Sequence, residues 1–338
     1  MVLRAPGDLV QDEVARPRQE ASQVQVRVTH SGVCGTDFKI FSGAIPVSYP
    51  RIMGHEMFGE VVDAGDAEAL RPGDRVIIDP ELYCGACFHC RTGQTHLCPN
   101  GMLVGRDTNG GFAEYLNAPA SHVFHVPDSI DSRTAPMIQV LTTCLHAQRQ
   151  IDIFPAESVV VFGLGVTGQL HVQLAKARGA SPVIGVTRSP EKRALAETLG
   201  ADITFPGGEG AIDRVRDATG GRGADAVIET TGVLPSVAAS VKMARAGGRV
   251  LLFGIITARE GALPFYDLYF KELSLIGARV AKSEDYPSSI ALVQRGTVRL
   301  EPLISDVLPL VELKAAIGML GSDSATRMKI IMEHNKVE

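Results

Sequence analysis

The sequence predicts an α/β protein with two domains, one mainly β and one a Rossmann-type domain with a doubly wound parallel sheet. A chain of 338 residues is too long for one compact core. Short strand patterns separated by turns occupy the part of the chain before about residue 130. From Glu157 onward, apolar strands alternate with helical patterns, which is typical of βαβ units and a parallel sheet.

The first part of the chain contains several short strand signals. Residues 24–33 alternate apolar and polar side chains and predict a strand, as do residues 59–63 and 75–79. The RPGD stretch at 71–74 predicts a turn between them. Residues 112–126 continue the pattern, so this part is expected to be mainly β.

The second part predicts alternating strands and helices. The helix that begins after Ser189 has clear boundaries, because Ser189 suits an N-cap, Pro190 a first turn and Gly200 a helix end. The expected strands cover residues 158–162, 183–186, 203–205, 226–229 and 249–253, and the expected helices cover 166–178, 190–199, 211–219 and 235–244.

Composition excludes some classes of partner. The net charge of −5 and the pI of about 6.0 argue against nucleic-acid binding, which requires a basic surface. The sequence lacks an apolar run of about 18 residues, which a membrane span requires. Its first residues lack the basic start and apolar stretch of a secretory signal. We therefore expect a cytoplasmic protein with neither a nucleic acid nor a membrane as partner.

Four of the six cysteines lie in one short loop with the spacing C-x2-C-x2-C-x7-C. In a reducing cytosol a disulfide framework is not expected. Four thiolates suit tetrahedral zinc and leave no open coordination position, so this site should be structural. The alternative is four ordinary buried cysteines. We interpret His89 and His96 as surface polar residues. The predicted ligands are Cys84, Cys87, Cys90 and Cys98.

A glycine-rich turn follows the first strand of the second part. Gly163, Gly165 and Gly168 form G-x-G-x-x-G between a strand and a helix, the context in which this motif binds a dinucleotide pyrophosphate. Val166, inside the motif, is expected to contact the cofactor with the glycines. The alternative is a glycine-rich turn without a ligand.

The end of the next strand bears on the choice of cofactor. An NAD site would carry an acidic residue there for the ribose 2′-hydroxyl, but this chain has Thr187 followed by Arg188. A hydroxyl and a guanidinium suit a 2′-phosphate, and Lys192 adds positive charge one helical turn later. We therefore favour NADP over NAD. In the alternative, Arg188 is a solvated surface charge and the enzyme uses NAD.

Two further motifs offer ligands for a catalytic metal. SGVCGTD at 31–37 supplies Cys34, and MGHEMFGEV at 53–61 supplies His55 and Glu56. Three protein ligands and one open position define a catalytic zinc. Simultaneous ligation by adjacent residues requires a bend, which Gly54 could supply; otherwise Glu56 lies behind the ligands for part of the cycle.

These motifs together resemble the zinc-dependent medium-chain dehydrogenases, of the alcohol and polyol (sorbitol) dehydrogenase kind. The resemblance rests on GVCGTD, GHE, GDRV at 73–76, the four-cysteine loop, GGFAEY at 110–115 and the GLGVTG turn, and covers nearly the whole chain. It implies a GroES-like catalytic domain over residues 1–145, a Rossmann domain over 146–281, and a return to the catalytic domain over 282–338. Relatives of this size are commonly tetramers, and a homo-oligomer, tetramer or dimer, is therefore expected.

The resemblance also implies roles for individual residues. Thr36 matches the hydroxyl that accepts the substrate proton, and Asp37 matches a carboxylate that orients the zinc-binding histidine. The relay ends at a His in some relatives, where this chain has Lys39. The segments ETTG and FGII are expected to line the cofactor, Thr231 among them.

One position departs from the family pattern. Relatives like sorbitol dehydrogenase carry a Glu near the zinc where this chain has Gln139. Gln is a poor zinc ligand, which favours Glu56 as the third ligand. Cys144 lies nearby in the sequence, and we interpret it as a buried small residue rather than a ligand.

The resemblance implies hydride transfer between an alcohol and NADP, with two zinc ions per chain. It indicates polyols, sugars or secondary alcohols as substrates. Two other classes stay open at this point. A zinc-free quinone or enone reductase would share the Rossmann half but lack Cys34, His55 and the cysteine loop. A non-enzymatic zinc-binding module would be built on the cysteine loop alone.

Overall fold

The computed structural model describes residues 1–321 and 325–334, which form two compact units. The first unit contains residues 1–142, 281–296 and those from 300 onward, and the second contains residues 143–280 and 297–299. Helix α3 (Met137–Ile151) begins in the first unit and ends in the second. Within the described residues, the structure has no helix with the length and apolar character of a membrane span.

The first unit is built on a mainly antiparallel sheet of seven strands in the described part of the chain. Its order is β16-β17-β3-β4-β5-β9, with β8 also paired to β3. The strand bounds are β16 (Ile304–Pro309), β17 (Lys329–Glu333), β3 (Gln23–Val33), β4 (Glu56–Asp63), β5 (Arg75–Ile78), β9 (Val123–His125) and β8 (Tyr115–Pro119). Two small antiparallel pairs accompany it, β1 (Val2–Ala5) with β2 (Asp8–Val10) and β6 (Glu81–Leu82) with β7 (Met102–Leu103).

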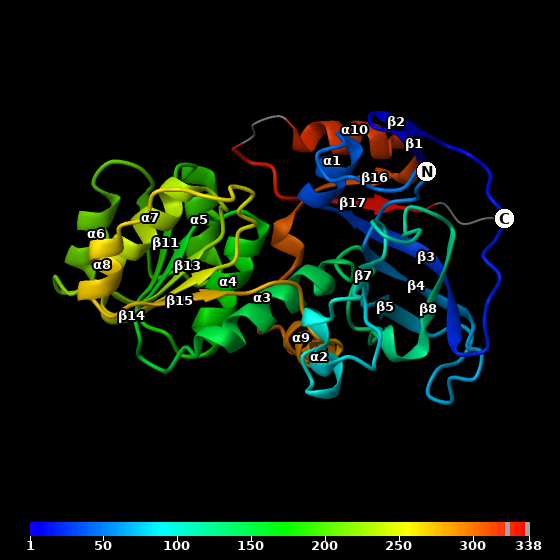
Figure 1. Ribbon diagram of the computed structural model, residues 1–338, viewed down its shortest axis with the longest axis horizontal. Helices are drawn as coiled ribbons and strands as arrows, with labels where there is room; N and C mark the ends of the chain where they lie inside the picture. Colours follow the sequence, from blue (N-terminus) through cyan, green and yellow to red (C-terminus); the bar gives the residue numbers. More distant parts are fainter. Residues whose placement is uncertain (322–324, 335–338) are drawn as a thin grey trace. The chain divides into compact units, whose positions relative to one another are not determined.

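The two ends of the chain meet in this sheet. Strand β17 pairs antiparallel with β3, with Met332 opposite Ser31, so the red and blue ends of the chain lie side by side in Figure 1. Helices α1 and α10 pack against the same apolar cluster, which includes Ile40, Met53 and Ile317. The helix bounds are α1 (Gly35–Phe41), α2 (Phe88–Arg91), α9 (Tyr286–Gln294) and α10 (Leu313–Leu320).

The second unit contains six parallel strands in the order β12-β11-β10-β13-β14-β15. The sheet runs outward in both directions from β10, and the order reverses between β10 and β13, which makes it doubly wound. The strand bounds are β10 (Val159–Phe162), β11 (Val183–Thr187), β12 (Ile203–Pro206), β13 (Ala224–Glu229), β14 (Ala244–Leu252) and β15 (Ser274–Gly277). The helix bounds are α4 (Val166–Ala177), α5 (Pro190–Thr198), α6 (Ala211–Ala218), α7 (Leu234–Met243) and α8 (Phe265–Phe270).

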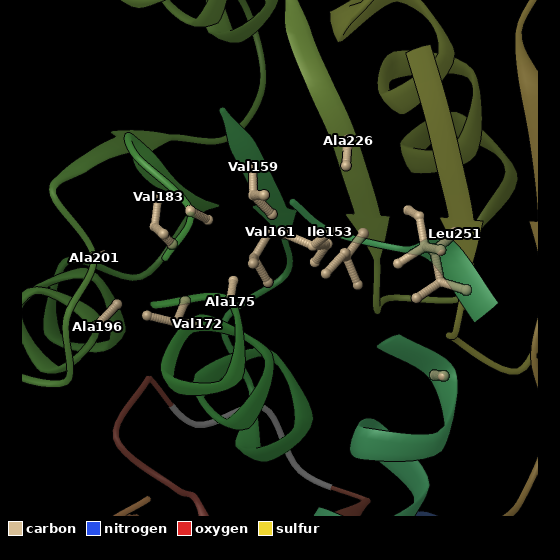
Figure 2. Close-up of a cluster of buried hydrophobic side chains, with 14 of the residues drawn as sticks. Ile153, Val159, Val161, Val172, Ala175, Val183, Ala196, Ala201, Ala226 and Leu251 are labelled. Carbon is tan, nitrogen blue, oxygen red and sulfur yellow. The ribbon is translucent and has the colours of Figure 1, made fainter. Parts of the chain in front are cut away.

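Both faces of this sheet are buried, which explains its continuous apolar strands. In β10, Val159 and Val161 join a cluster with Val172 and Ala175 of α4, and Figure 2 shows these side chains between helix and sheet. Val160 points to the opposite face, where it joins a cluster with residues of α6 and α7.

The predicted fold class is confirmed: a mainly β unit and a doubly wound parallel sheet are both present. The four expected helices lie within one residue of the observed α4, α5, α6 and α7. Helix α8 was not anticipated from the sequence, and it carries the exposed aromatic side chains Phe265, Tyr266, Tyr269 and Phe270.

Candidate active site and metal centres

The four clustered cysteines of the loop after β6 come together at one point. Their sulfur atoms all lie within 4.8 Å of one another. The Sγ atoms of Cys84 and Cys90 are 4.0 Å apart, those of Cys87 and Cys98 are 3.9 Å apart, and those of Cys98 and Cys84 are 3.5 Å apart. Tetrahedral zinc with Zn–S near ~2.3 Å separates its sulfurs by about 3.8 Å. The donor set therefore fits zinc, and a disulfide would require a much shorter S–S distance.

The loop also favours a cation electrostatically. Backbone N–H groups of Ala86 and Cys87 lower the pKa of Cys84 to about 6. Burial and the hydrogen bonds of its thiol with Cys87, Cys98 and Cys84 raise the pKa of Cys90 to about 12. His89 and His96, expected on the surface, are both partly buried, and His89 Nδ1 lies 3.2 Å from Gln94 Oε1.

A second cluster forms where β3 meets α1 and β4 begins. Potential ligand atoms of Cys34, His55 and Glu56 lie within 4.8 Å of one another. Cys34 is the N-cap of α1, and Gly54, directly before His55, has a φ of +97°. This left-handed conformation, which favours glycine, supplies a bend before the adjacent residues His55 and Glu56.

Asp37 connects the two motifs of this cluster. Its Oδ2 accepts the backbone N–H of Cys34 at 2.8 Å, and its Oδ1 lies 3.5 Å from Nδ1 of His55. Burial alone would lower the pKa of His55, but attraction to Asp37 outweighs it and holds the pKa well above its ordinary value. The pocket therefore stabilises positive charge on or beside the imidazole, and a cation at Nε2 suits the same field.

Glu56 has a partner that the sequence did not reveal. Nζ of Lys329 donates to both carboxylate oxygens of Glu56 at 2.7 Å, and both side chains are buried. Burial would lower the pKa of Lys329, but attraction to Glu56 and Cys34 raises it above its ordinary value. The carboxylate is thus already neutralised by a lysine, which weakens the case for Glu56 as the third ligand. A lysine at the start of an apolar strand was the only signal in the sequence.

The remaining residues expected at this site lie in the first unit or at its boundary. Thr36 is partly exposed in the first turn of α1. Gln139 is buried in the first turn of α3. Cys144, later in the same helix, is also buried, and its Sγ contacts the carbonyl of Thr167 at 3.8 Å.

The glycine-rich turn lies at the carboxyl end of β10, where the strand order reverses. A Cβ atom on Gly168 would lie 1.9 Å from the carbonyl oxygen of Gly163, so helix and turn are in close backbone contact. At Gly165, the N-cap of α4, a Cβ atom would meet nothing within 4 Å. Val166 begins the helix. Open space and free N–H groups at this turn are what a pyrophosphate requires.

Thr187 and Arg188 lie at the carboxyl end of β11, on the same edge of the sheet. Arg188 is exposed, and within residues 1–321 and 325–334 its side chain forms no ion pair. Lys192 lies in the first turn of α5, where its N–H donates to Ser189 Oγ at 3.1 Å. Arg193, which no sequence motif singled out, donates from Nη1 to the carbonyls of Thr187 and Arg188, both at 3.2 Å. It therefore fixes the turn that carries the predicted specificity residues.

Thr231 lies in the turn after β13. The buried carboxylate of Glu229 accepts the Thr231 N–H at 2.8 Å and the Gly232 N–H at 3.0 Å, and it also accepts the Thr231 hydroxyl. The neighbouring Thr230 donates to the carbonyl of Gly163 at 2.9 Å. These bonds hold the turn with Thr231 beside the glycine-rich turn.

Comparison with known proteins agrees with this architecture. Residues 20–128 match the family described as alcohol dehydrogenase GroES-like domain, and residues 166–295 match the family described as zinc-binding dehydrogenase. An uncharacterised zinc-type alcohol dehydrogenase-like protein of Haemophilus influenzae is 31% identical over 97% of this chain and 96% of its own length. The 2-dehydro-3-deoxy-L-galactonate 5-dehydrogenase of Pseudoalteromonas atlantica is 31% identical over 94% of this chain and 93% of its own.

Among solved structures, a zinc-binding dehydrogenase of Sinorhizobium meliloti bound to NADP is 32% identical, with a TM-score of 0.92 and 98% of each chain covered. The fold and the two cysteine-containing clusters thus define a metal-dependent oxidoreductase with a dinucleotide-binding domain. The chain belongs to the zinc-type alcohol dehydrogenase family and is an oxidoreductase that acts on alcohol groups.

Proposed function

We propose that this protein is a zinc-dependent dehydrogenase that prefers NADP(H) and interconverts the secondary alcohol of a polyol, sugar or sugar acid with a ketone. The observation that carries the proposal is the Cys34–His55–Glu56 cluster, with Asp37 behind the imidazole. The substrate class is supported by the Pseudoalteromonas relative, whose name describes a dehydrogenase of a sugar acid.

The proposal assigns two zinc ions to each chain. The four cysteines of the loop would hold one, with a structural role because no coordination position is left open. Cys34 and His55 would hold the other, and Glu56 would join them as a ligand only where its carboxylate turns from Lys329 toward the metal. A zinc ion there supplies Lewis acidity, which eases removal of the alcohol proton and polarises the carbonyl in the reverse direction.

The chain's own residues position the reactants and move the proton. Asp37 Oδ1 faces Nδ1 of His55 at 3.5 Å and would orient the imidazole so that Nε2 is left for the metal. Thr36, one residue before Asp37, would accept the alcohol proton through its hydroxyl. A bound nicotinamide ring would supply the hydride acceptor, so that one C–H and one O–H bond of the alcohol would break while the carbonyl forms. Lys39, on the same helix, is a candidate for the last step of the proton relay.

Preference for NADP is supported by the end of β11. A carboxylate there would bind a 2′-hydroxyl and repel a 2′-phosphate, and this chain has Thr187 and Arg188 instead. The Sinorhizobium structure with NADP supports the same preference. Lys192 adds charge at the start of α5.

We further propose that the protein is a homo-oligomer and works in the cytoplasm. Assembly with a second copy is supported by the exposed aromatic side chains of α8 beside β15, the outermost strand of its sheet. Strands related by a two-fold axis at such an edge pair antiparallel and cover each other's free backbone groups. The cytoplasm is supported by the cysteine cluster, which binds metal only in its reduced form.

Steady-state kinetics with both cofactors test the proposal. The zinc-loaded protein is assayed with polyols, sugars and sugar acids while reduced nicotinamide absorbance is followed, and metal content is measured in parallel. We expect two zinc ions per chain and a higher kcat/KM with NADP. Loss of one charge-assisted hydrogen bond corresponds to about tenfold to a hundredfold, so Arg188→Ala should lower NADP efficiency by that factor and leave NAD unchanged.

Arg222→Ala is the matched control, because Arg222 is an exposed arginine of the same unit outside this turn. An equal effect of Arg188→Ala on both cofactors, or better activity of the wild-type protein with NAD, would refute the cofactor assignment. Absence of zinc from the active protein would refute the metal assignment.

A further inference from the structure

A hollow in the first unit combines two arginines with a size suited to a small molecule. It has a volume of about 400 Å³, which is within the range of ligand pockets. The loop after α1 and the loop before GGFAEY form it. Its lining residues are Pro46, Val47, Ser48, Arg51, Arg106 and Asp107.

The two arginines of the hollow have different partners. Arg106 is neutralised, because its Nη2 lies 2.6 Å from Oδ2 of Asp107. Burial would raise the pKa of Asp107, but hydrogen bonds from Arg106 and from the Leu103 N–H outweigh this effect and lower it. Asp107, which is the one carboxylate of the lining, is therefore already paired with Arg106.

Arg51 has no such close partner, although its charge also helps to lower the pKa of Asp107. Within residues 1–321 and 325–334 it forms no ion pair, and its one side-chain hydrogen bond goes from Nη1 to the neutral Asn109 Oδ1 at 3.5 Å. Its Nε is buried and has no hydrogen-bond partner. A buried charged donor without an acceptor is unfavourable unless a ligand supplies one. The lining therefore has two arginines against one carboxylate, and the surplus positive charge lies on Arg51.

The same backbone carries Arg51 and the catalytic histidine. Arg51 exchanges main-chain hydrogen bonds with Leu3 at 2.8 and 2.9 Å, which holds it in place four residues before His55. The loop with Arg106 is packed on the bend before His55, because a Cβ on Gly105 would lie 2.5 Å from the carbonyl oxygen of Gly54. The two loops of the hollow are thus attached to the backbone segment that leads to His55.

From these observations we propose that Arg51, with Arg106 and Ser48, binds the anionic group of the substrate, a carboxylate or a phosphate monoester. This inference rests on the proposed dehydrogenase function and deepens it, because it assigns the substrate to the negatively charged polyols. Guanidinium groups suit both anions through paired N–H donors.

Kinetics with matched substrates test the subsite. D-gluconate, glucitol 6-phosphate and neutral glucitol are compared in the zinc-loaded wild type, Arg51→Met and Arg51→Lys. For the anionic substrates we expect Arg51→Met to raise KM about tenfold to a hundredfold with little change in kcat, and Arg51→Lys to restore part of the loss. The neutral hexitol should be affected less than twofold. A larger effect for gluconate indicates a carboxylate site, and one for the phosphate ester indicates a phosphate site.

Two controls distinguish a failure of the anion subsite from a failure of the proposed dehydrogenase function. Arg71→Met removes the same charge from an exposed turn of the same unit and should change no KM. Inorganic phosphate should inhibit wild type competitively against the anionic substrate and Arg51→Met far less. An equal effect on neutral and anionic substrates, or non-competitive inhibition by phosphate, would overturn the subsite and leave the dehydrogenase function standing. Loss of all activity with every substrate in wild type would instead refute the proposed function.

If Arg51→Met does not fold, the double variant Arg106→Gln/Asp107→Asn removes the other guanidinium without leaving a lone carboxylate. It should raise KM for the anionic substrates at unchanged KM for glucitol. Unchanged KM for all three substrates in this variant would also contradict the subsite.

Discussion

The charged side chains of the candidate metal site each face a side chain of opposite charge. Glu56 is paired with Lys329, and His55 faces Asp37, although all four side chains are buried. Each buried charge would be costly alone. The site therefore depends on complete pairs, and removal of one partner has consequences that removal of both does not.

Lys329→Met should destabilise the protein by about 3–5 kcal/mol, because it leaves the Glu56 carboxylate buried without its partner. The double variant Lys329→Met/Glu56→Gln should recover much of this loss, since no lone charge remains. Urea unfolding of the zinc-loaded proteins measures both. A double variant no more stable than the single variant would show that the ion pair is not the source of the effect.

Cys34→Ser should lower turnover by at least about a hundredfold, because the metal that activates the alcohol is lost. NADP binding, measured by titration, should stay within about twofold, because the glycine-rich turn belongs to the other unit. Cys144→Ser is the matched control and should keep its activity, since Cys144 is buried inside α3. Near-normal turnover in Cys34→Ser would contradict the catalytic zinc, and loss of turnover in Cys144→Ser would make that residue a ligand.

Asp79 should make stability depend on pH. Burial raises its pKa to about 6, although hydrogen bonds from Ser283 and from the Glu81 N–H oppose the increase. The folded state therefore holds the proton of Asp79 more tightly than the unfolded state does. The stability that the protonated carboxyl contributes is fully present below about pH 4 and is lost as pH rises through about 6.

Asp79→Asn cannot titrate, so the variant should gain stability relative to wild type between pH 4 and pH 7. The gain should be about 3 kcal/mol, because each tenfold difference in proton affinity between the folded and unfolded states corresponds to about 1.4 kcal/mol. Unfolding at each pH, with both proteins compared under the same conditions, measures the difference. A constant difference between the two proteins across this range would show that the carboxyl of Asp79 titrates normally.

At the scale of elements, the turn between β10 and α4 combines two different requirements for glycine. Gly168 is required by packing, because its neighbour is the backbone of Gly163. Gly165 has no neighbour within 4 Å, so the fold does not require its small size and leaves room there for the proposed pyrophosphate. We therefore expect substitution by alanine to have different effects at these two glycines of one motif.

Gly168→Ala should destabilise the second unit by about 1–3 kcal/mol, because a backbone carbonyl cannot yield as a flexible side chain does. Gly165→Ala should change stability by no more than about 1 kcal/mol but weaken NADP binding more than about tenfold, since the methyl group meets the pyrophosphate. Thermal unfolding and titration calorimetry separate the two. Normal NADP binding by Gly165→Ala would place the pyrophosphate elsewhere.

At the scale of the whole molecule, the C-terminal strand pairs with an N-terminal strand. A second feature is an exposed aromatic surface on α8. Strand β17 pairs with β3, so the C-terminal segment is part of the sheet of the first unit. In the second unit, β15 has a neighbour on one side only among the described residues, and α8 exposes Tyr266 and Tyr269 to 73% and 77%. Exposed apolar side chains of this extent are typical of interaction surfaces.

The double variant Tyr266→Ser/Tyr269→Ser should lower the oligomeric state, because the interface would lose two large aromatic anchors. Light scattering coupled to gel filtration measures the mass, and Phe154→Ser, an exposed aromatic position outside α8, is the control. An unchanged mass for the double variant would exclude α8 from the interface, and a monomeric wild-type protein would refute the proposed assembly.

The predictions that the structure confirms come from short stretches of sequence. The periodicity of the strands and helices was sufficient for the parallel sheet, because burial on both faces leaves a local apolar pattern. The four cysteines lie within fifteen residues, and the three glycines lie within six, so their spacing alone predicts that they meet. Cys34 and His55 were grouped by their ligand chemistry and not by a spacing that predicts contact, and the structure brings them together beside the bend at Gly54.

By itself the sequence determined the fold class, the cysteine cluster and the glycine-rich turn, because each depends on interactions between residues close in the chain. Only the tertiary structure decided that Lys329 pairs with Glu56, 273 residues away, and that Arg51 and Arg106 share one hollow. It also decided that Arg193 holds the turn of Thr187 and Arg188. These contacts follow from which strands pair and how loops pack on them, and such long-range pairing leaves no periodic signal in a single sequence.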